Sequence, residues 1–196
     1  SEAGRGKTTQ LYINPDNVAN FADLAKQTRE AGLEANGVAP YLVLQITHAG
    51  RYGDGKVIAV HEPEIDAKAG VDPDKPVITD EELLALEDDF VAAARLASEA
   101  GFDAVDVKAC HRYLFSELLG AHTREGEYGG SYENRTRILK NIIRKIKEAG
   151  IPIEVTTRLN SWDGIPLPYG WASDENGAPD LTDTKRLVKE LSDLGL

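Results

Sequence analysis

Hydrophobic residues along the chain follow two periodicities, which alternate from one end to the other. Four segments carry apolar residues at the three- and four-residue spacing of a helix, namely 14–32, 79–100, 131–149 and 182–194. Three short apolar runs between them have the composition of buried strands, at 41–46, 104–107 and 153–159. Alternating helices and strands predict an α/β fold, and right-handed crossovers then make the sheet parallel.

Capping residues mark the ends of the predicted helices. Helix starts are predicted at four residues whose side chains can accept a backbone hydrogen bond: Asn14, Thr79, Ser131 and Thr182. Thr79 is followed three residues later by Glu82, the spacing of a capping box. The first three helices are predicted to end at glycines: Gly32, Gly101 and Gly150.

The connections that follow strands are long, whereas those that follow helices are short. Residues 48–78 form a glycine- and proline-rich stretch that is predicted to be irregular, and such loops are uncommon in compact domains unless they are functional or disordered. In α/β proteins the functional loops lie at the carboxyl ends of the strands. No strand is followed by a Gly-x-Gly-x-x-Gly or Walker loop, so the classical dinucleotide and P-loop folds are disfavoured.

These features favour a TIM (β/α)8-barrel type of fold. A complete barrel has eight strands and about 250 residues, whereas this chain has 196 residues and three predicted strands. We therefore expect an incomplete barrel of about three parallel strands with flanking helices, forming a single partial domain over residues 1–196. The chain has no methionine and begins at Ser1, which predicts that it is processed or cut from a longer chain.

Composition argues against several classes of partner. The formal net charge of −11 disfavours nucleic acid, which is bound through clustered lysines and arginines. No apolar run reaches the roughly 18 residues of a membrane span, and the polar residues 1–10 contain no signal-peptide core. A single cysteine, Cys110, cannot form an internal disulfide, so a cytoplasmic location is predicted.

Polar side chains cluster at or just beyond the end of each predicted strand. The candidates for chemistry among them are Gln45, Lys108, His111, Tyr113 and Arg158, and they are accompanied by Thr47, His48, Arg51, Arg112 and Asn160. A glutamine within an apolar strand must find hydrogen-bond partners or cost about 1 to 3 kcal/mol. Either a bound heterocycle with amide-like edges or the neighbouring backbone would satisfy it. A cation at the end of a strand calls for a carboxylate or an anionic ligand.

The second strand is followed within six residues by an ammonium, an imidazole and a phenol. Lys108 and His111 can point into the mouth of the sheet, and Tyr113 can donate a proton to a ligand there. For each residue a structural role is the alternative; His111, for example, could cap a helix or pack in the core. Cys110 is interpreted as a small buried residue. No metal site is predicted, because the histidines lack carboxylate or cysteine neighbours at a ligand spacing.

Four stretches combine into a family pattern: QITHAGR at 45–51, AGFDAVDV at 100–107 leading into HRYL at 111–114, YGGSYENR at 128–135, and Arg158 at the end of its strand. The third stretch is the most specific. By itself it is typical of a tight turn that leads into a helix cap. The order and spacing of all four resemble the NADH:flavin oxidoreductase or old yellow enzyme family, including its 2,4-dienoyl-CoA reductase branch. The resemblance extends from about residue 10 onward.

The resemblance implies an FMN-binding barrel that takes hydride from NADH or NADPH and passes it to an activated alkene, such as an enone or enoyl compound. By position, Gln45 corresponds to the residue that hydrogen-bonds the flavin pyrimidine edge. Arg158 corresponds to the cation near flavin N1 and the C2 carbonyl. Tyr113 matches the proton donor to the substrate carbon, and His111 matches one of the two residues that hold the substrate carbonyl oxygen.

The sequence departs from the family pattern at three places. Lys108 occupies the position of the first carbonyl-binding histidine, so we expect either that an ammonium holds the substrate oxygen or that the substrate is a different one. Arg112 replaces a glycine and is predicted to narrow or recharge the pocket. The loop at 120–127 is shorter than usual and has Gly126 where an aspartate is common.

The extent of the resemblance places the chain in the middle of a barrel, at about the third to fifth strands. The phosphate-binding loops of the family lie outside this region. We therefore expect the isolated chain to bind FMN weakly or not at all, and we expect its two free sheet edges to favour self-association into homo-oligomers.

Two alternatives remain open on sequence grounds. Lys108 at a barrel strand end could form a Schiff base, as in aldolases, with Tyr113 or His111 as proton shuttle. The chain could also be a barrel fragment without catalytic competence of its own.

Overall fold

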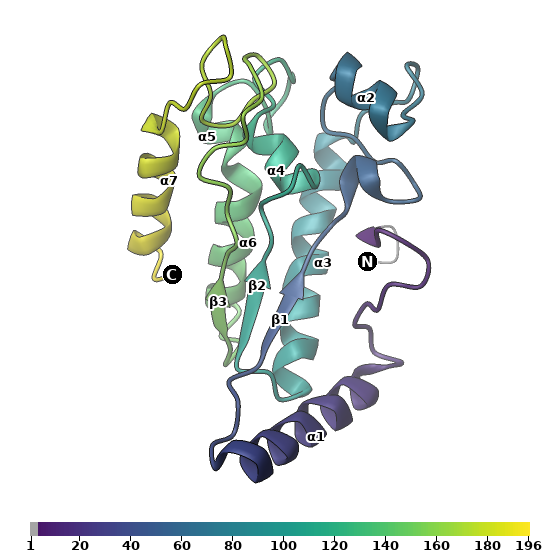
Figure 1. The fold of residues 1–196 in the computed structure, drawn as a ribbon, viewed down its shortest axis with the longest axis vertical. Helices are drawn as coiled ribbons and strands as arrows, with labels where there is room; N and C mark the ends of the chain where they lie inside the picture. The colour runs from purple at the N-terminus through teal and green to yellow at the C-terminus, as the bar shows by residue number, and fades with distance from the viewer. Residues whose placement is uncertain (1–3) are drawn as a thin grey trace.

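The computed structural model describes residues 4–196, which form a three-stranded parallel sheet with helices (Figure 1). The strands are β1 (Val43–Ile46), β2 (Ala104–Val107) and β3 (Glu154–Thr156), in that spatial order. The longer helices are α1 (Val18–Asn36), α3 (Asp80–Glu99), α6 (Arg137–Glu148) and α7 (Thr182–Asp193). The short elements are η2 (Gly50–Tyr52), α2 (Pro63–Ala69), α4 (Leu114–Leu119) and α5 (Tyr132–Arg135).

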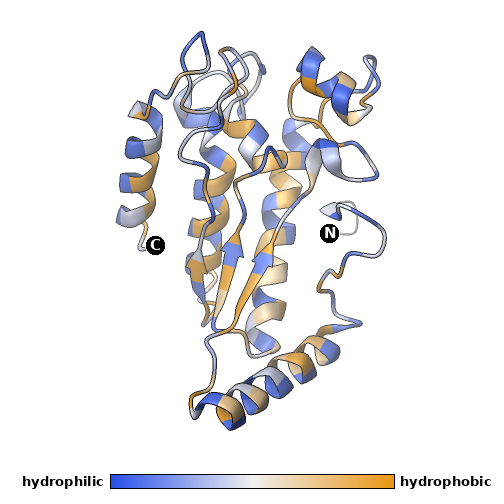
Figure 2. Cartoon of the chain, viewed as in Figure 1, coloured by the Kyte–Doolittle hydropathy of each residue, from blue (hydrophilic) through white to orange (hydrophobic). Residues whose placement is uncertain are grey.

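The two faces of the sheet differ because strand residues point alternately to opposite sides. One face carries the buried residues Ile46, Val105, Val107 and Val155, which join the hydrophobic core with α3 and α6. In Figure 2 the apolar positions of these two helices lie toward the strands. On the other face Gln45, Glu154 and Thr156 are exposed, and within residues 4–196 no helix packs on it.

The start of α3 confirms the predicted capping box. The Thr79 hydroxyl accepts a hydrogen bond from the Glu82 amide at 3.1 Å, and the Glu82 carboxylate accepts one from the Thr79 amide at 2.8 Å. Two of the free amide groups at the helix start are thereby satisfied.

Replacing Thr79 with alanine is expected to lower the free energy of unfolding by about 0.5 to 2 kcal/mol, because the cap is lost. Thr182→Ala is the matched control. Thr182 is also predicted to be a cap, but its hydroxyl donates to Asp180 and caps no helix amide. Urea denaturation of both variants measures the difference, and an equal loss in both would contradict the assignment.

One predicted helix start and one predicted helix end are wrong. The Asn14 side chain accepts from the amides of Asp16 and Asn17 in a turn, so α1 begins only at Val18. The helix runs through Gly32 and ends at Gly37, whose φ of 72° suits glycine. Gly32 is needed for space instead, because a Cβ there would lie 2.6 Å from the Pro40 ring.

The helix predicted from residue 131 is divided into two. Ser131 caps only the short α5, through a 3.3 Å hydrogen bond from the Asn134 amide. Thr136 separates α5 from α6, and its hydroxyl donates to the Tyr132 carbonyl at 2.8 Å. The apolar face predicted for the following helix is confirmed, since its isoleucines and leucine are buried against the core. Arg135 at the break donates to the Leu119 carbonyl, which ties it to the preceding loop.

The long connection after β1 is less irregular than predicted, because it contains η2 and α2. A buried ion cluster holds it in place. Arg51 from η2 is fully buried and contacts Asp66 of α2 at 2.5 Å and Glu117 of α4 at 2.9 Å. The helix α4, which the sequence pattern did not predict, therefore anchors the loop that follows a different strand.

No helix within residues 4–196 is long and apolar enough to cross a membrane. The same residues contain no group of three or more histidine, cysteine, aspartate or glutamate side chains arranged to hold a metal ion.

Candidate functional site

The carboxyl ends of the three strands bring residues from distant parts of the chain together. Gln45 of β1 lies beside Asp106 of β2, and Asp106 lies beside Thr156 of β3 in the parallel register. The Gln45 Nε2 donates to Asp106 Oδ2 at 3.0 Å, and the Arg158 backbone amide donates to Asp106 Oδ1 at 2.9 Å. Asp106, which the sequence analysis did not single out, therefore links the two predicted cofactor residues.

Gln45 and Arg158 both keep hydrogen-bonding capacity free on the exposed sheet face. The Gln45 Oε1 accepts no hydrogen bond from any of the described residues. The Arg158 guanidinium likewise has no ion-pair or hydrogen-bond partner among residues 4–196, although its backbone carbonyl accepts from Ala109 at 2.9 Å. The two side chains thus present an amide acceptor and a cation at the same edge of the sheet.

Lys108 is the most buried of the predicted site residues, with 8% of its surface exposed. Its Nζ lies 3.6 Å from the centre of the Tyr113 ring, in a cation–π contact. Burial, helped by the positive charge of Arg158, lowers the pKa of Lys108, although the neighbouring Cys110 and Asp106 act in the opposite direction. No carboxylate among the described residues forms an ion pair with this ammonium.

His111 lies on the outer side of the same cluster and is exposed. Its ring centre is 6.4 Å from that of Tyr113, with the rings nearly perpendicular. Desolvation and the positive charges of Lys108 and Arg158 lower the pKa of His111, which favours the neutral form of the ring. A neutral imidazole can donate one hydrogen bond to a ligand oxygen.

Tyr113 connects this cluster to helix α4 and to the loop after β1. It occupies the N-cap position of α4 and is partly buried. Its ring also lies 6.1 Å from that of Tyr52, which comes from the loop after β1. Lys108, His111 and Tyr113, which the sequence analysis named after the second strand, thus lie in one cluster at the end of β2, and Tyr52 packs near it.

Arg112 does not recharge the pocket as expected, because its guanidinium is held inside the protein. It forms ion pairs with Glu62 at 2.5 Å and with Asp163 at 3.3 Å, and it donates to the Tyr169 carbonyl at 3.0 Å. These partners come from the loops after β1 and β3, so the side chain ties both loops to the turn after β2. His111 and Arg112 both have positive φ, at 63° and 54°, a backbone conformation that non-glycine residues adopt at a cost.

Replacing Arg112 with lysine is expected to lower the free energy of unfolding by about 1.5 to 3 kcal/mol, the contribution of one charged hydrogen bond. A lysine has no planar fork and cannot reach all three partners at once. Arg95→Lys is the control, because Arg95 is exposed on α3. Denaturant melts of both variants provide the comparison, and an unchanged Arg112→Lys midpoint would refute this role.

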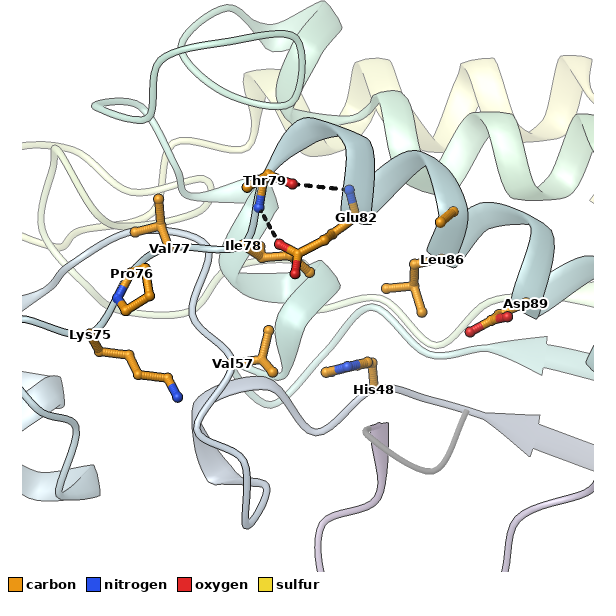
Figure 3. Close-up of a pocket in the computed structure, with 11 residues that line it drawn as sticks. His48, Val57, Lys75, Pro76, Val77, Ile78, Thr79, Glu82, Leu86 and Asp89 are labelled. Atoms are coloured by element: carbon orange, nitrogen blue, oxygen red, sulfur yellow. Dashed lines mark hydrogen bonds between the residues drawn. The ribbon is translucent and has the colours of Figure 1, made fainter.

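His48 lies away from this cluster, in the wall of a cavity of about 540 Å³ between the loop after β1 and helix α3 (Figure 3). Val57 and Leu86 also line the cavity, and the Thr79 capping box stands at its edge. None of the five predicted site residues borders it. His48 Nδ1 accepts a hydrogen bond from the Gly50 amide at 3.1 Å, which requires the unprotonated nitrogen.

Burial lowers the pKa of His48 to about 4. As pH falls below 6.5, the unfolded chain takes up this proton before the folded protein does, so the free energy of unfolding is expected to fall between pH 6.5 and about 4. The variant His48→Asn keeps an acceptor for Gly50 but does not titrate there. Its unfolding free energy should change less over this range than that of the unaltered protein; an equal change would contradict the prediction.

The YGGSYENR stretch at 128–135 has a structural role in this fold. The Tyr128 hydroxyl donates to the buried Glu87 carboxylate at 2.9 Å, and this contact and burial raise the pKa of Tyr128. Gly129 is required by a close approach, because a Cβ there would lie 2.5 Å from the Arg124 carbonyl oxygen. Gly130 has a φ of 75°, so the two glycines have the turn role that was expected of them. None of the contacts described for this stretch involves Lys108, His111 or Tyr113.

Comparison with known proteins gives a consistent assignment. The family model described as NADH:flavin oxidoreductase / NADH oxidase family matches residues 1–166. The chain is 36% identical over 141 residues to an NADH:flavin oxidoreductase of Gibberella zeae, covering 69% of this chain and 34% of that protein. It is 32% identical over 164 residues to an NADPH dehydrogenase of Bacillus subtilis, covering 81% and 42% respectively.

Solved structures show the same fold. Morphinone reductase superposes with a TM-score of 0.72 and 25% identity, covering all of this chain and 55% of that chain. Old yellow enzyme from Pichia sp. superposes with a TM-score of 0.71 and 23% identity, over 97% and 52% respectively. The three parallel strands and their helices are therefore part of a (β/α)8 barrel, as predicted.

The chain spans between about a third and two fifths of the two curated relatives described above. The family model nevertheless covers most of the chain itself. This chain belongs to the NADH:flavin oxidoreductase / NADH oxidase family.

Proposed function

We propose that this chain supplies part of the flavin site and the proton-donating side of an FMN-dependent NAD(P)H oxidoreductase that reduces activated alkenes. The observation that carries the proposal is the convergence of five side chains at one sheet edge, namely Gln45, Lys108, His111, Tyr113 and Arg158. Family membership supports the flavin and the nicotinamide reductant. The alkene acceptor, such as an enone or enoyl compound, comes from the resemblance alone.

The donor set on the exposed sheet face fits a flavin ring. The free Gln45 Oε1 would accept a hydrogen bond from the imide N–H of the pyrimidine edge, while Asp106 keeps the amide oriented. The unpaired Arg158 guanidinium would stabilise negative charge on the same edge. A bound FMN would supply the hydride relay between nicotinamide and acceptor. The protein contributes orientation of the ring and a fixed positive charge.

The Lys108 cluster would serve the acceptor. His111 and Lys108 can each donate a hydrogen bond to the oxygen of an electron-withdrawing group, which polarises the conjugated double bond. The Tyr113 hydroxyl would give a proton to the acceptor carbon that does not receive hydride. Tyr113 is held for this task by the start of α4 and by the Lys108 ammonium on its ring.

The test compares the whole protein with the isolated chain. We expect the whole protein to purify with FMN and to show its absorbance, and we expect the isolated chain to bind FMN weakly, because it spans less than half of its curated relatives. In the whole protein, Gln45→Leu should weaken FMN binding at least tenfold in a titration followed by flavin fluorescence. Val43→Leu is the control, because Val43 lies two residues before Gln45 in β1 and is exposed on the same face of the sheet. Full FMN affinity in Gln45→Leu would contradict the proposal.

The finer assignments are proposals as well. We place the chain near the 2,4-dienoyl-CoA reductase branch, at about strands three to five of its barrel, and in a cytoplasmic protein with small-molecule substrates. The edge strands β1 and β3 expose backbone groups that favour pairing with further strands or with a second copy.

A second function is favoured by one observation. A buried lysine with a lowered pKa beside a phenol is also the arrangement of a Schiff-base enzyme. Borohydride treatment with a carbonyl substrate would then leave a stable adduct on Lys108, detectable by mass spectrometry. Such an adduct would favour the lyase over the oxidoreductase.

The remaining alternative is that the chain is a barrel fragment without activity of its own. Oxidation of NADH by the isolated chain with added FMN would exclude this alternative.

A further inference from the structure

The buried ammonium of Lys108 has no anionic partner in the described part of the chain. Only 8% of the surface of Lys108 is exposed. Among the described residues, the interaction found for its ammonium is a cation–π contact with the Tyr113 ring, whose centre lies 3.6 Å from Nζ. Taking an ammonium out of water is costly unless a negative charge or several acceptors replace the lost hydration. The face of an aromatic ring replaces only a part of that hydration.

The Asp106 carboxylate, which acts electrostatically on Lys108, already accepts two hydrogen bonds. Asp106 lies two residues before Lys108 on the same strand, and its two oxygens accept from the Gln45 amide and from the Arg158 backbone. Besides Asp106, the Arg158 guanidinium and the Cys110 side chain act on Lys108, and the positive charges of Lys108 and Arg158 act on His111. At the carboxyl end of the strands, the two cations Lys108 and Arg158 therefore outnumber the one carboxylate of Asp106, although the formal net charge of the whole chain is −11.

We infer that the acceptor of this enzyme carries a carboxylate next to its activated double bond, and that Lys108 binds that carboxylate. The inference rests on the proposed function and specifies its substrate class. The Lys108 ammonium would form a charge-assisted hydrogen bond with one oxygen of the carboxylate. The His111 ring, in its neutral form, would donate a hydrogen bond to the other oxygen. Reduced FMN, when bound, would supply the hydride and the Tyr113 hydroxyl the proton, so that the double bond would gain two electrons and two hydrogens while the flavin returns to its oxidised form.

The experiment uses the whole protein with its flavin reduced anaerobically by dithionite, so that nicotinamide binding does not enter. Two matched acceptors are mixed with it: trans-3-benzoylacrylate and its methyl ester, which share the double bond and ketone but differ in charge. Flavin reoxidation is followed by absorbance. We expect the second-order rate constant for the acid to exceed that for the ester at least tenfold.

Two variants assign this preference to Lys108. Lys108→Met, of similar length without charge, should slow the acid at least tenfold more than it slows the ester, so that the preference for the acid is lost. Lys108→Arg, which keeps the charge, should retain most of it. Flavin content and circular dichroism of each variant verify that the fold is intact, and the comparison of acid with ester in the unaltered protein needs no variant at all.

The outcomes separate this inference from the function on which it rests. Equal rates for acid and ester in the unaltered protein, or an equal loss for both in Lys108→Met, would overturn the inference and leave the oxidoreductase intact. A protein whose reduced flavin is reoxidised by neither compound, or which holds no flavin, would overturn the proposed function and this inference with it.

Discussion

Replacing Glu117 with alanine is expected to lower the free energy of unfolding by about 3 to 5 kcal/mol, the cost of removing one partner from a buried ion pair. Glu117 and Arg51 are both fully buried, and Glu117 accepts from the Arg51 Nε at 3.0 Å. Its other oxygen accepts from the backbone amides of Ala59 and Val60 at 2.6 and 3.1 Å. The substitution therefore removes one of the two carboxylate partners of the buried Arg51 guanidinium and leaves the Ala59 and Val60 amides without this acceptor in the core.

Guanidinium denaturation followed by circular dichroism measures this loss. Glu125→Ala, at an exposed glutamate in the loop after α4, is the matched control and should change stability by less than about 0.5 kcal/mol. Glu117→Gln should fall between the two, since the amide keeps an acceptor for the backbone but loses the charge. A Glu117→Ala protein as stable as the control would mean that the cluster does not hold the loop after β1.

If the proposed alkene reduction is the activity of the whole protein, replacing Tyr113 with phenylalanine is expected to slow it by about 10²- to 10⁴-fold, the usual contribution of a positioned proton donor. The ring contacts with Lys108 and Tyr52 remain, because only the hydroxyl is removed. Reduction of the flavin by NADPH transfers no proton to the acceptor, so that half of the reaction should change little. Stopped-flow absorbance separates the two halves.

Tyr52→Phe is the control for this prediction, because it removes a hydroxyl from the neighbouring ring that has no proposed chemical role. If Tyr113→Phe slows both halves equally, the phenol positions ligands and donates no proton to the acceptor. If it slows neither, Tyr113 has a structural role at the start of α4.

Much of the fold was predictable from local patterns. The strand at 104–107 was predicted with its observed bounds, because a short run of small and branched apolar residues between a glycine and a polar segment has few other solutions. The capping box at Thr79 is equally local, since both of its hydrogen bonds span three residues. The wrong helix ends at Asn14 and Gly32 depend on a turn and on a contact with Pro40, which spacing alone does not reveal.

The candidate site, too, was predictable only where the residues lie close together in the sequence. Lys108, His111 and Tyr113 could be found because they follow a strand within six residues. Asp106 could not be assigned its role, because its partner Gln45 lies 61 residues away and Arg158 lies 52 residues away. Arg112 was expected to alter the pocket, yet its guanidinium is committed to partners 50 and 51 residues distant, and only the packing of three loops brings these together.

The sequence by itself determined the alternation of helices and strands, the parallel sheet and the identity of the polar residues at the strand ends, because these follow from periodicity and from short-range hydrogen bonding. The tertiary structure decided which of those residues are free to meet a ligand. Arg51 and Arg112 form buried ion pairs and are therefore not available to a ligand. Among the described residues, Lys108 is buried without a carboxylate partner, and the Arg158 guanidinium has no ion-pair partner. Pairing between residues far apart in the chain depends on strand register and loop packing, and local sequence carries no record of it.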